Sequence, residues 1–285
     1  MKQTIRRTKN GGFTLMEMLV VLILAMVIVT GVYKLLMGQS RLYMKQNELM
    51  DVRTTLRSAA SLLAWELRQT SPAGGDLYEI NQYWVTLRSI QGTGVVCGKH
   101  GLQPRVAVWD SKGEFNAAEA DSALLFAGGA KGVQDDTWLI VDLTDEWLTG
   151  GGDVDCVWDD GMGGTVDEDF VLEVDGILDE VIIGGPIRAF RKVEYSIYPE
   201  GNRWWLGRKV GDAAEYEKLT GPLRPPGDSG LVFVYYDRSG NETADPAKVA
   251  LIDIIIRGES LRAAPMSGGT SVQRDSLRLR VSTRN

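Results

Sequence analysis

The architecture of the chain follows from one apolar stretch, Gly11-Gly12-Phe13-Thr14-Leu15-Met16-Glu17-Met18-Leu19-Val20-Val21-Leu22-Ile23-Leu24-Ala25-Met26-Val27-Ile28-Val29. From Phe13 to Met37 the only charged residues are Glu17 and Lys34. At about 1.5 Å per residue, a helix of this length spans the hydrocarbon core of a bilayer, which is roughly 30 Å thick. A helix is also the one single segment that satisfies its own backbone in lipid. We therefore predict a helix that can cross a membrane.

The residues before this stretch are basic. Four cations precede it and no acidic residue does: Lys2, Arg6, Arg7 and Lys9. A basic flank of this kind stays in the cytoplasm, so we expect the body that follows to be exported. A cleavable secretory signal would show an Ala-x-Ala-like site after the apolar run, and Leu36-Met37-Gly38-Gln39-Ser40 fits that pattern poorly. A plain signal anchor is the alternative.

Glu17 is the unusual residue of the stretch. A lone carboxylate inside a membrane costs roughly 2.5–3.5 kcal/mol on insertion scales, and such residues are usually functional with a specific partner. A plain anchor gives no reason to keep it. Glu17 therefore predicts a cationic partner at the same depth.

The segment Gly12-Phe13-Thr14-Leu15-Met16-Glu17 resembles the class III signal of type IV prepilins and type II secretion pseudopilins. In that family a membrane prepilin peptidase cuts after the glycine that matches Gly12 and methylates the new amine, here on Phe13. The carboxylate that matches Glu17 then faces the N-terminal amine of a neighbouring subunit. The attraction is stronger in a low-dielectric environment than in water. The resemblance thus implies processing at Gly12 and Phe13 and assembly through Glu17.

Composition bounds what the exported body can do. Hydrophobic residues make up 44% of the chain, which suffices for a core, and the length leaves room for one large domain or two small ones. The formal charge is −7, and loss of the basic leader makes the remainder more acidic. A strongly acidic body argues against nucleic acid or anionic lipid as the main partner.

The chain contains two cysteines, Cys97 and Cys156. An exported compartment favours oxidation, so a single disulfide is a candidate. The chain-entropy model assigns such a bridge about 4 kcal/mol. Two unpaired buried thiols are the alternative.

The helical pattern continues beyond the apolar stretch. Between Gly38 and Thr70 apolar residues recur at three, four and seven positions and mark one face of a helix: Leu42, Leu49, Val52, Leu56, Ala59 or Ala60, Leu63 and Leu67. Ser71-Pro72-Ala73-Gly74-Gly75 predicts its end. We expect this amphipathic half to pack against the sheet of the head, the alternative being a foreign partner.

From Tyr83 onward short apolar or alternating runs predict strands. The predicted strands are Tyr83–Ile90, Arg105–Asp110, Ala123–Ala127, Thr137–Leu143, Phe170–Val174, Glu180–Ile183, Arg191–Tyr198, Trp204–Val210, Leu231–Tyr236, Val249–Arg257 and Ser276–Val281. Their spacing and the glycine-rich gaps favour a largely antiparallel sheet. The fold class we predict is α+β, with a long N-terminal helix packed on a β-rich head.

One pair of runs predicts a hairpin. Val193–Tyr198 and Arg203–Leu206 flank a four-residue turn, Pro199-Glu200-Gly201-Asn202. Successive side chains of a strand point to opposite faces, so Trp204 and Trp205 cannot share one. At least one of the two is then expected to be exposed or covered by a loop.

Later segments are similar to PilW-type minor pilins. The similarity lies in Arg53 to Gly74, in Leu231–Asp237 followed by Ser239-Gly240, in Val249 to Arg257 and in a terminal Leu279-Arg280-Val281 with the ending Arg284-Asn285. The J-type minor pseudopilins of type II secretion share much of this plan. The resemblance covers the full length in outline and is tight only from Gly11 to about Met37.

The densest polar cluster runs from Gly152 to Asp169 and suggests calcium. Related minor pilins often carry an aspartate-rich loop here, and calcium takes six to eight hard oxygen ligands. The candidate ligands are Asp153, Asp155, Asp159, Asp167, Glu168 and Asp169. Gly161 and Gly163 stand where that loop has aspartates. A solvated acidic loop is the alternative, and no cofactor is required.

We find no catalytic constellation and expect no enzyme. His100 is the only histidine, and Gly98-Lys99-His100-Gly101 reads as a loop. Gly92-Thr93-Gly94 lacks the spacing and the helix of a dinucleotide fingerprint, and there is no Walker A sequence.

The resemblance implies a division into a cytoplasmic leader (1–12), a membrane or filament-core helix (13–37), its amphipathic continuation (38–70) and an exported β-rich head (76–285). It implies a minor pilin that takes part in type IV pilus assembly at or near the tip. A type II secretion pseudopilin, or a tip adhesin that binds through exposed aromatics such as Trp204 or Trp205, is the alternative. The implied partners are prepilin peptidase, other pilins through the N-terminal helix, and the inner-membrane assembly platform. The implied location is the inner membrane, single-pass with the head in the periplasm, and then the filament.

Overall fold

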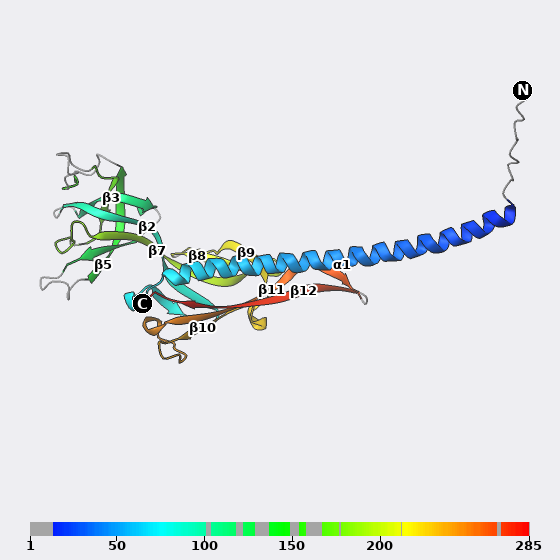
Figure 1. The fold of residues 1–285 in the computed structure, drawn as a ribbon. Helices are drawn as coiled ribbons and strands as arrows, with labels where there is room; N and C mark the ends of the chain where they lie inside the picture. The colour runs from blue at the N-terminus through cyan, green and yellow to red at the C-terminus, as the bar shows by residue number, and fades with distance from the viewer. Residues whose placement is uncertain are drawn as a thin grey trace, which may run out of the picture.

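The fold is a long helix with a β-rich head at its C-terminal end (Figure 1). The computed structural model describes residues 14–100, 104–117, 122–128, 137–148, 154–157, 167–176, 178–211, 213–266 and 269–284. The α+β class predicted from the sequence is confirmed, because one N-terminal helix precedes a large antiparallel sheet.

The helix α1 runs without interruption from Leu15 to Gln69. Thr14 caps its start, where the Thr14 Oγ1 accepts a hydrogen bond from the Glu17 N–H at 3.3 Å. At its end the Thr70 hydroxyl donates to the Leu67 carbonyl at 2.8 Å. The apolar and amphipathic halves predicted from the sequence therefore form one rod, which ends before the Ser71–Gly75 stop signal.

In the part of the head that the structure describes, the elements are strands and the short 3₁₀ turns η1 (Pro72–Gly74), η4 (Pro226–Asp228) and η5 (Pro246–Lys248). The strands are β1 (Leu77–Ile80), β2 (Trp84–His100), β3 (Arg105–Gly113), β4 (Ser122–Ala127), β5 (Thr137–Leu148), β6 (Phe170–Val174), β7 (Pro186–Glu200), β8 (Arg203–Val210), β9 (Glu217–Leu223), β10 (Leu231–Tyr236), β11 (Leu251–Met266) and β12 (Gly269–Ser282). Among the described residues, every strand pairing is antiparallel.

Several strand predictions need correction. The predicted strand Glu180–Ile183 is wrong: only Val181 forms an isolated bridge, to Ala127, and the segment turns at Gly184, which has φ 90°. The strands β1 and β9 were not predicted. β1 is short, and the Gly221-Pro222 pair of β9 reads as a strand breaker.

β2 is much longer than the predicted strand Tyr83–Ile90. Its glycines beyond Ile90 stand at shifts in the register of the ladder and do not end the strand. The register shifts between Ile90 and Gly92 and between Val96 and Gly98. A Cβ added to Gly92 would lie 2.4 Å from the Glu114 carbonyl oxygen, so glycine permits the close approach. His100, expected in a loop, is accordingly the last residue of β2.

The predicted β7–β8 hairpin exists, with a shorter turn. Glu200 pairs with Arg203, so only Gly201 and Asn202 form the turn, and Gly201 has φ 64°.

Trp204 packs at the edge of the core under α1. Trp205 lies on the other face, where the Lys218 Nζ sits 3.5 Å from its ring centroid. Both indoles are partly buried.

One half of the head is a closed barrel. β2 pairs with β3, and the order continues through β6, β5 and β4 to β7, which pairs with β2 again. The barrel core, as we call it, contains buried side chains from all of these strands, among them Val96, Val106, Leu125, Val141, Leu172 and Ile187.

The other half packs on the helix. The sheet of β8, β9, β11, β10 and β12, with the adjoining ends of β2 and β7, buries a second core against α1. The helix-packed core, as we call it, includes Val52, Leu56, Ala59, Leu63 and Leu67 from α1 and Leu87, Tyr195, Leu206, Phe233, Ile252, Ile254 and Ile256 from the strands. The amphipathic half of α1 thus packs on its own sheet. Leu42, predicted on the same face, is 61% exposed and lies before Val52, the first buried residue of α1.

The helix approaches β11 closely at one glycine. A Cβ added to Gly258 would lie 3.2 Å from Val52 Cγ1 and 3.3 Å from Leu56 Cδ2. Polar contacts flank this place, where the Arg53 Nε donates to the Asp275 carboxylate at 2.8 Å. Packing and ion pairing together fix the rotation of α1 on the sheet.

Leu63 provides a test of this packing, since its side chain is 0% exposed between α1 and the sheet. We expect Leu63→Ala to lower the free energy of unfolding of the head by about 2–5 kcal/mol, because it leaves a cavity in a close-packed core. Chemical denaturation of the full-length chain in a mild detergent measures this. The control is Trp65→Ala, whose side chain is 62% exposed on the same helix and should change stability by less than about 0.5 kcal/mol. Equal effects of the two variants would contradict the packing described here.

Candidate functional site

The candidate assembly site is the N-terminal part of α1. Gly12 and Phe13 lie outside the described residues. Glu17 is described: it lies in the first turn of the helix and is exposed. The partial positive charge at a helix N-terminus favours a carboxylate there.

The sequence Thr14-Leu15-Met16-Glu17 also fits a capping box, a signal that the sequence analysis missed. In that motif the glutamate side chain returns to the backbone N–H of the capping residue. The structure contains the half of the box in which the Glu17 N–H donates to Thr14. Among the described residues no hydrogen bond engages the Glu17 carboxylate.

The head leaves the first half of the helix uncovered. Every residue from Thr14 to Asn47 is exposed, including large apolar side chains such as Leu15, at 85%, and Leu22, at 69%. Burial begins at Val52. Among the described residues one helix, α1, is long and apolar enough to cross a membrane. A water-exposed surface of this kind marks a membrane or protein contact.

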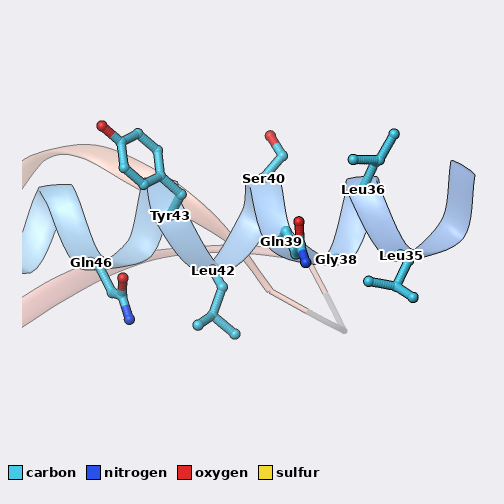
Figure 2. Close-up of a pocket in the computed structure, with 8 residues that line it drawn as sticks. All are labelled: Leu35, Leu36, Gly38, Gln39, Ser40, Leu42, Tyr43 and Gln46. Atoms are coloured by element: carbon cyan, nitrogen blue, oxygen red, sulfur yellow. The ribbon is translucent and has the colours of Figure 1, made fainter. Parts of the chain in front are cut away.

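The part of α1 between the apolar run and the head shows how open this surface is. Figure 2 shows that Leu36, Ser40 and Tyr43 point to one side of the helix and that Leu35, Leu42 and Gln46 point to the other. All of the lining residues come from this single helix, so no second wall encloses a cavity. The segment can therefore be contacted from several directions at once, as a helix inside a bundle must be.

Cys97 and Cys156 form a disulfide in the structure. Cys97 lies on β2, and the segment Val154–Val157 lies against it, with the Val157 N–H donating to the Cys97 carbonyl at 2.9 Å. A Cβ added to Gly98 would lie 2.2 Å from the Asp155 carbonyl oxygen, so glycine allows this contact. The bridge closes a loop with a sequence separation of 59, which corresponds to about 4 kcal/mol in the chain-entropy model.

The calcium candidates are only partly described. Asp153 and Asp159 lie outside the described residues. Asp155 and Asp167 are exposed, Glu168 is 7% exposed, and the Asp169 Oδ2 accepts a hydrogen bond from the Ser111 N–H at 2.7 Å. In the part of the chain that the structure describes, no three His, Cys, Asp or Glu side chains gather to hold a metal ion.

Calcium binding therefore stays a prediction. Calorimetric titration of the full-length chain with Ca²⁺ tests it, and a rise in melting temperature should accompany the heat of binding. The absence of both heat and thermal shift at millimolar ion would remove calcium from consideration.

A buried carboxylate on β11 pairs with two arginines of β12. Asp253 is 1% exposed and accepts hydrogen bonds from the Arg280 Nε at 2.6 Å and from Arg278 at 2.5 Å. These hydrogen bonds, that from Arg280 first, lower the pKa of Asp253 from 3.8 to about 2 against the opposing effect of burial. Their contribution to stability is present at neutral pH and is lost as the pH falls through the range from 3.8 to 2. The hydrogen bonds from Arg278 and Arg280 to Asp253 thus link β12 to β11.

Comparison with known proteins bears on the N-terminus alone. A model of the prokaryotic N-terminal methylation motif matches residues 7–33. No curated protein and no solved structure matched the chain. The match spans the junction between Gly12 and Phe13, includes Glu17 and ends inside the apolar half of α1. The motif and the long apolar helix together support a relationship with type IV pilins and pseudopilins, whose processing by prepilin peptidase and assembly with other pilins this motif implies.

Proposed function

We propose that this chain is a minor pilin, most like the PilW type, that enters or initiates a type IV pilus at or near its tip. The single observation that carries the proposal is the coincidence of the methylation motif at residues 7–33 with a helix whose first half is entirely uncovered. An apolar rod that its own head leaves bare needs another apolar environment. The membrane supplies that environment before assembly, and the helices of other pilins supply it afterwards.

Glu17 gives the assembly step its specificity. In the proposed mechanism prepilin peptidase cuts between Gly12 and Phe13, and the methylated Phe13 amine of a neighbouring subunit pairs with the Glu17 carboxylate. Among the described residues no hydrogen bond engages its carboxylate, and this absence and its exposed position support the role. The precursor would cross the inner membrane once, with its head in the periplasm, and the assembly platform would move it into the filament.

A J-type minor pseudopilin of a type II secretion system would use the same N-terminal chemistry. Deletion of the gene separates the two machines, because loss of surface pili with normal exoprotein release favours the pilus and the opposite result favours secretion. The tip-adhesin alternative through Trp204 or Trp205 stays a prediction, and both indoles are partly buried in the head.

The proposed function predicts how the N-terminus is processed. Mass spectrometry of the protein from cells that contain prepilin peptidase should find a chain that begins at Phe13 and carries one N-methyl group. Cells without the peptidase should retain residues 1–12. A mature protein that keeps residues 1–12, or begins elsewhere, would exclude the prepilin assignment.

Variants of Glu17 can separate the effect of its charge from the effect of its position in the capping box. Glu17→Gln keeps a side chain that can complete the box and removes the charge. We expect Glu17→Gln and Glu17→Ala to be processed normally and to reduce filament assembly at least about tenfold, because both lose the ion pair. Quantification of the protein in sheared filaments and in the membrane measures the effect.

Asp51→Asn is the matched control, because Asp51 is an exposed carboxylate farther along the same helix. It should assemble like the unmodified chain. Normal assembly of Glu17→Gln together with failure of Glu17→Ala would assign Glu17 to helix capping and contradict the ion pair.

A further inference from the structure

A cavity of about 290 Å³ lies where α1 ends against the barrel. Its walls come from distant parts of the chain: the turn after α1, β2, β4, β5, β7 and the C-terminal segment. On the barrel side, Leu124 pairs with Arg188 and Phe126 pairs with Trp138. The barrel side chains that line the cavity therefore lie on the outer face of the barrel, opposite its core.

Positive charge dominates this cavity. Three arginines line it, Arg88, Arg188 and Arg284, together with a single carboxylate, Asp76. Both oxygens of that carboxylate are engaged within the fold: Oδ1 accepts from Arg88 at 2.7 Å and Oδ2 accepts from the Ser71 N–H at 2.8 Å. No carboxylate of the described residues forms an ion pair with Arg188 or Arg284. The concentration of cations is unusual in a chain whose formal charge is −7.

Aromatic rings hold two of these guanidinium groups in place. The Arg88 side chain is 2% exposed, and its guanidinium carbon lies 4.4 Å from the Phe190 ring centroid. Its Nε has no hydrogen-bond acceptor among the described residues. The Arg188 guanidinium carbon lies 4.9 Å from the Trp138 ring centroid. Because stacking already restricts these side chains, a ligand would lose less side-chain entropy on binding them.

We propose that this cavity, the junction pocket, binds a compact oxyanion of up to about the size of a monosaccharide. Guanidinium groups present forked donors that match carboxylate and phosphate oxygens, and the partly exposed Trp138 offers an apolar wall for the rest of the ligand. Gln69 and Ser71 add neutral polar groups at the rim. The shared chemistry is an oxyanion on a small polar ring, with either a carboxylate or a phosphate as the charged group.

A purely structural role accounts for only part of this arrangement. The backbone N–H of Arg284 donates to the Thr70 carbonyl at 2.9 Å. A cation beside the C-terminus of α1 is also favourable in itself. Arg88 is likewise used by Asp76. Among the residues that the structure describes, Arg188 has neither a helix end nor a carboxylate as its partner, and its stacked position beside Trp138 carries the inference.

The test is calorimetric titration of the full-length chain in a neutral detergent with glucuronate, glucose 6-phosphate and uncharged glucose. We expect saturable binding of at least one of the two anions and none of glucose. Which anion binds distinguishes the carboxylate from the phosphate. The thermal melt of each variant named in the next paragraph checks that the variant is folded.

Three variants localise the binding. Arg188→Gln should weaken it at least about tenfold, because a charged hydrogen-bond donor is lost. Arg188→Lys keeps the charge, loses the fork and should weaken binding less than the glutamine variant. Arg274→Gln removes an exposed arginine from the far end of β12 and should bind like the unmodified chain.

Three results would overturn the proposal: no binding of either anion at millimolar concentration, unchanged binding by a folded Arg188→Gln variant, or an equal loss in Arg274→Gln. Because processing and filament assembly are not measured in this experiment, its failure would leave the proposed pilin function standing.

Discussion

One uninterrupted helix has to satisfy two environments, and its burial pattern divides sharply between them. Side chains are exposed up to Asn47 and become buried at Val52, within little more than one turn. The close approach at Gly258 sets the distance between α1 and β11, and the contact between Arg53 and Asp275 supports it at the edge. Because α1 is continuous, fixing its second half on the sheet also fixes the direction in which the bare first half leaves the head (Figure 1).

The β2–β7 ladder joins the two halves of the head. Its register runs from Trp84 and Ser196 under the helix to Val95 and Pro186 in the barrel. Tyr195, at one end, is 1% exposed in the helix-packed core, and Ile187, at the other, is fully buried in the barrel core. The two cores therefore share strands and cannot be separated by cutting a linker. The junction pocket lies beside this ladder, where the barrel, the end of α1 and the C-terminal segment meet.

Sequence patterns predicted what depends on local periodicity. The extent of α1, the face that carries Leu56 and Leu63, and most strands with alternating apolar residues could be predicted in this way. The barrel could not, because its closure depends on pairing between β2 and β7, and glycines conceal the second half of β2. The junction pocket was also hidden. Arg88, Arg188 and Arg284 are far apart in the sequence, and no spacing rule relates them. The motif around Gly12 and Glu17 needed no tertiary information, since its chemistry is encoded within a few consecutive residues.

The bare half of α1 gives a physical basis for the assembly role proposed for Glu17. A carboxylate on a fully solvated helix would be hydrated and would discriminate poorly between partners. A carboxylate among exposed leucines and valines becomes desolvated when those side chains are covered, whether by lipid or by neighbouring helices. Desolvation then makes an unpaired charge costly and a matched amine favourable. In the proposed assembly, the apolar surface drives burial without selecting a position, and Glu17 would select the position. Both features are needed, because apolar packing alone would permit many axial offsets between neighbouring rods, whereas one charge near the end of each rod favours a single one.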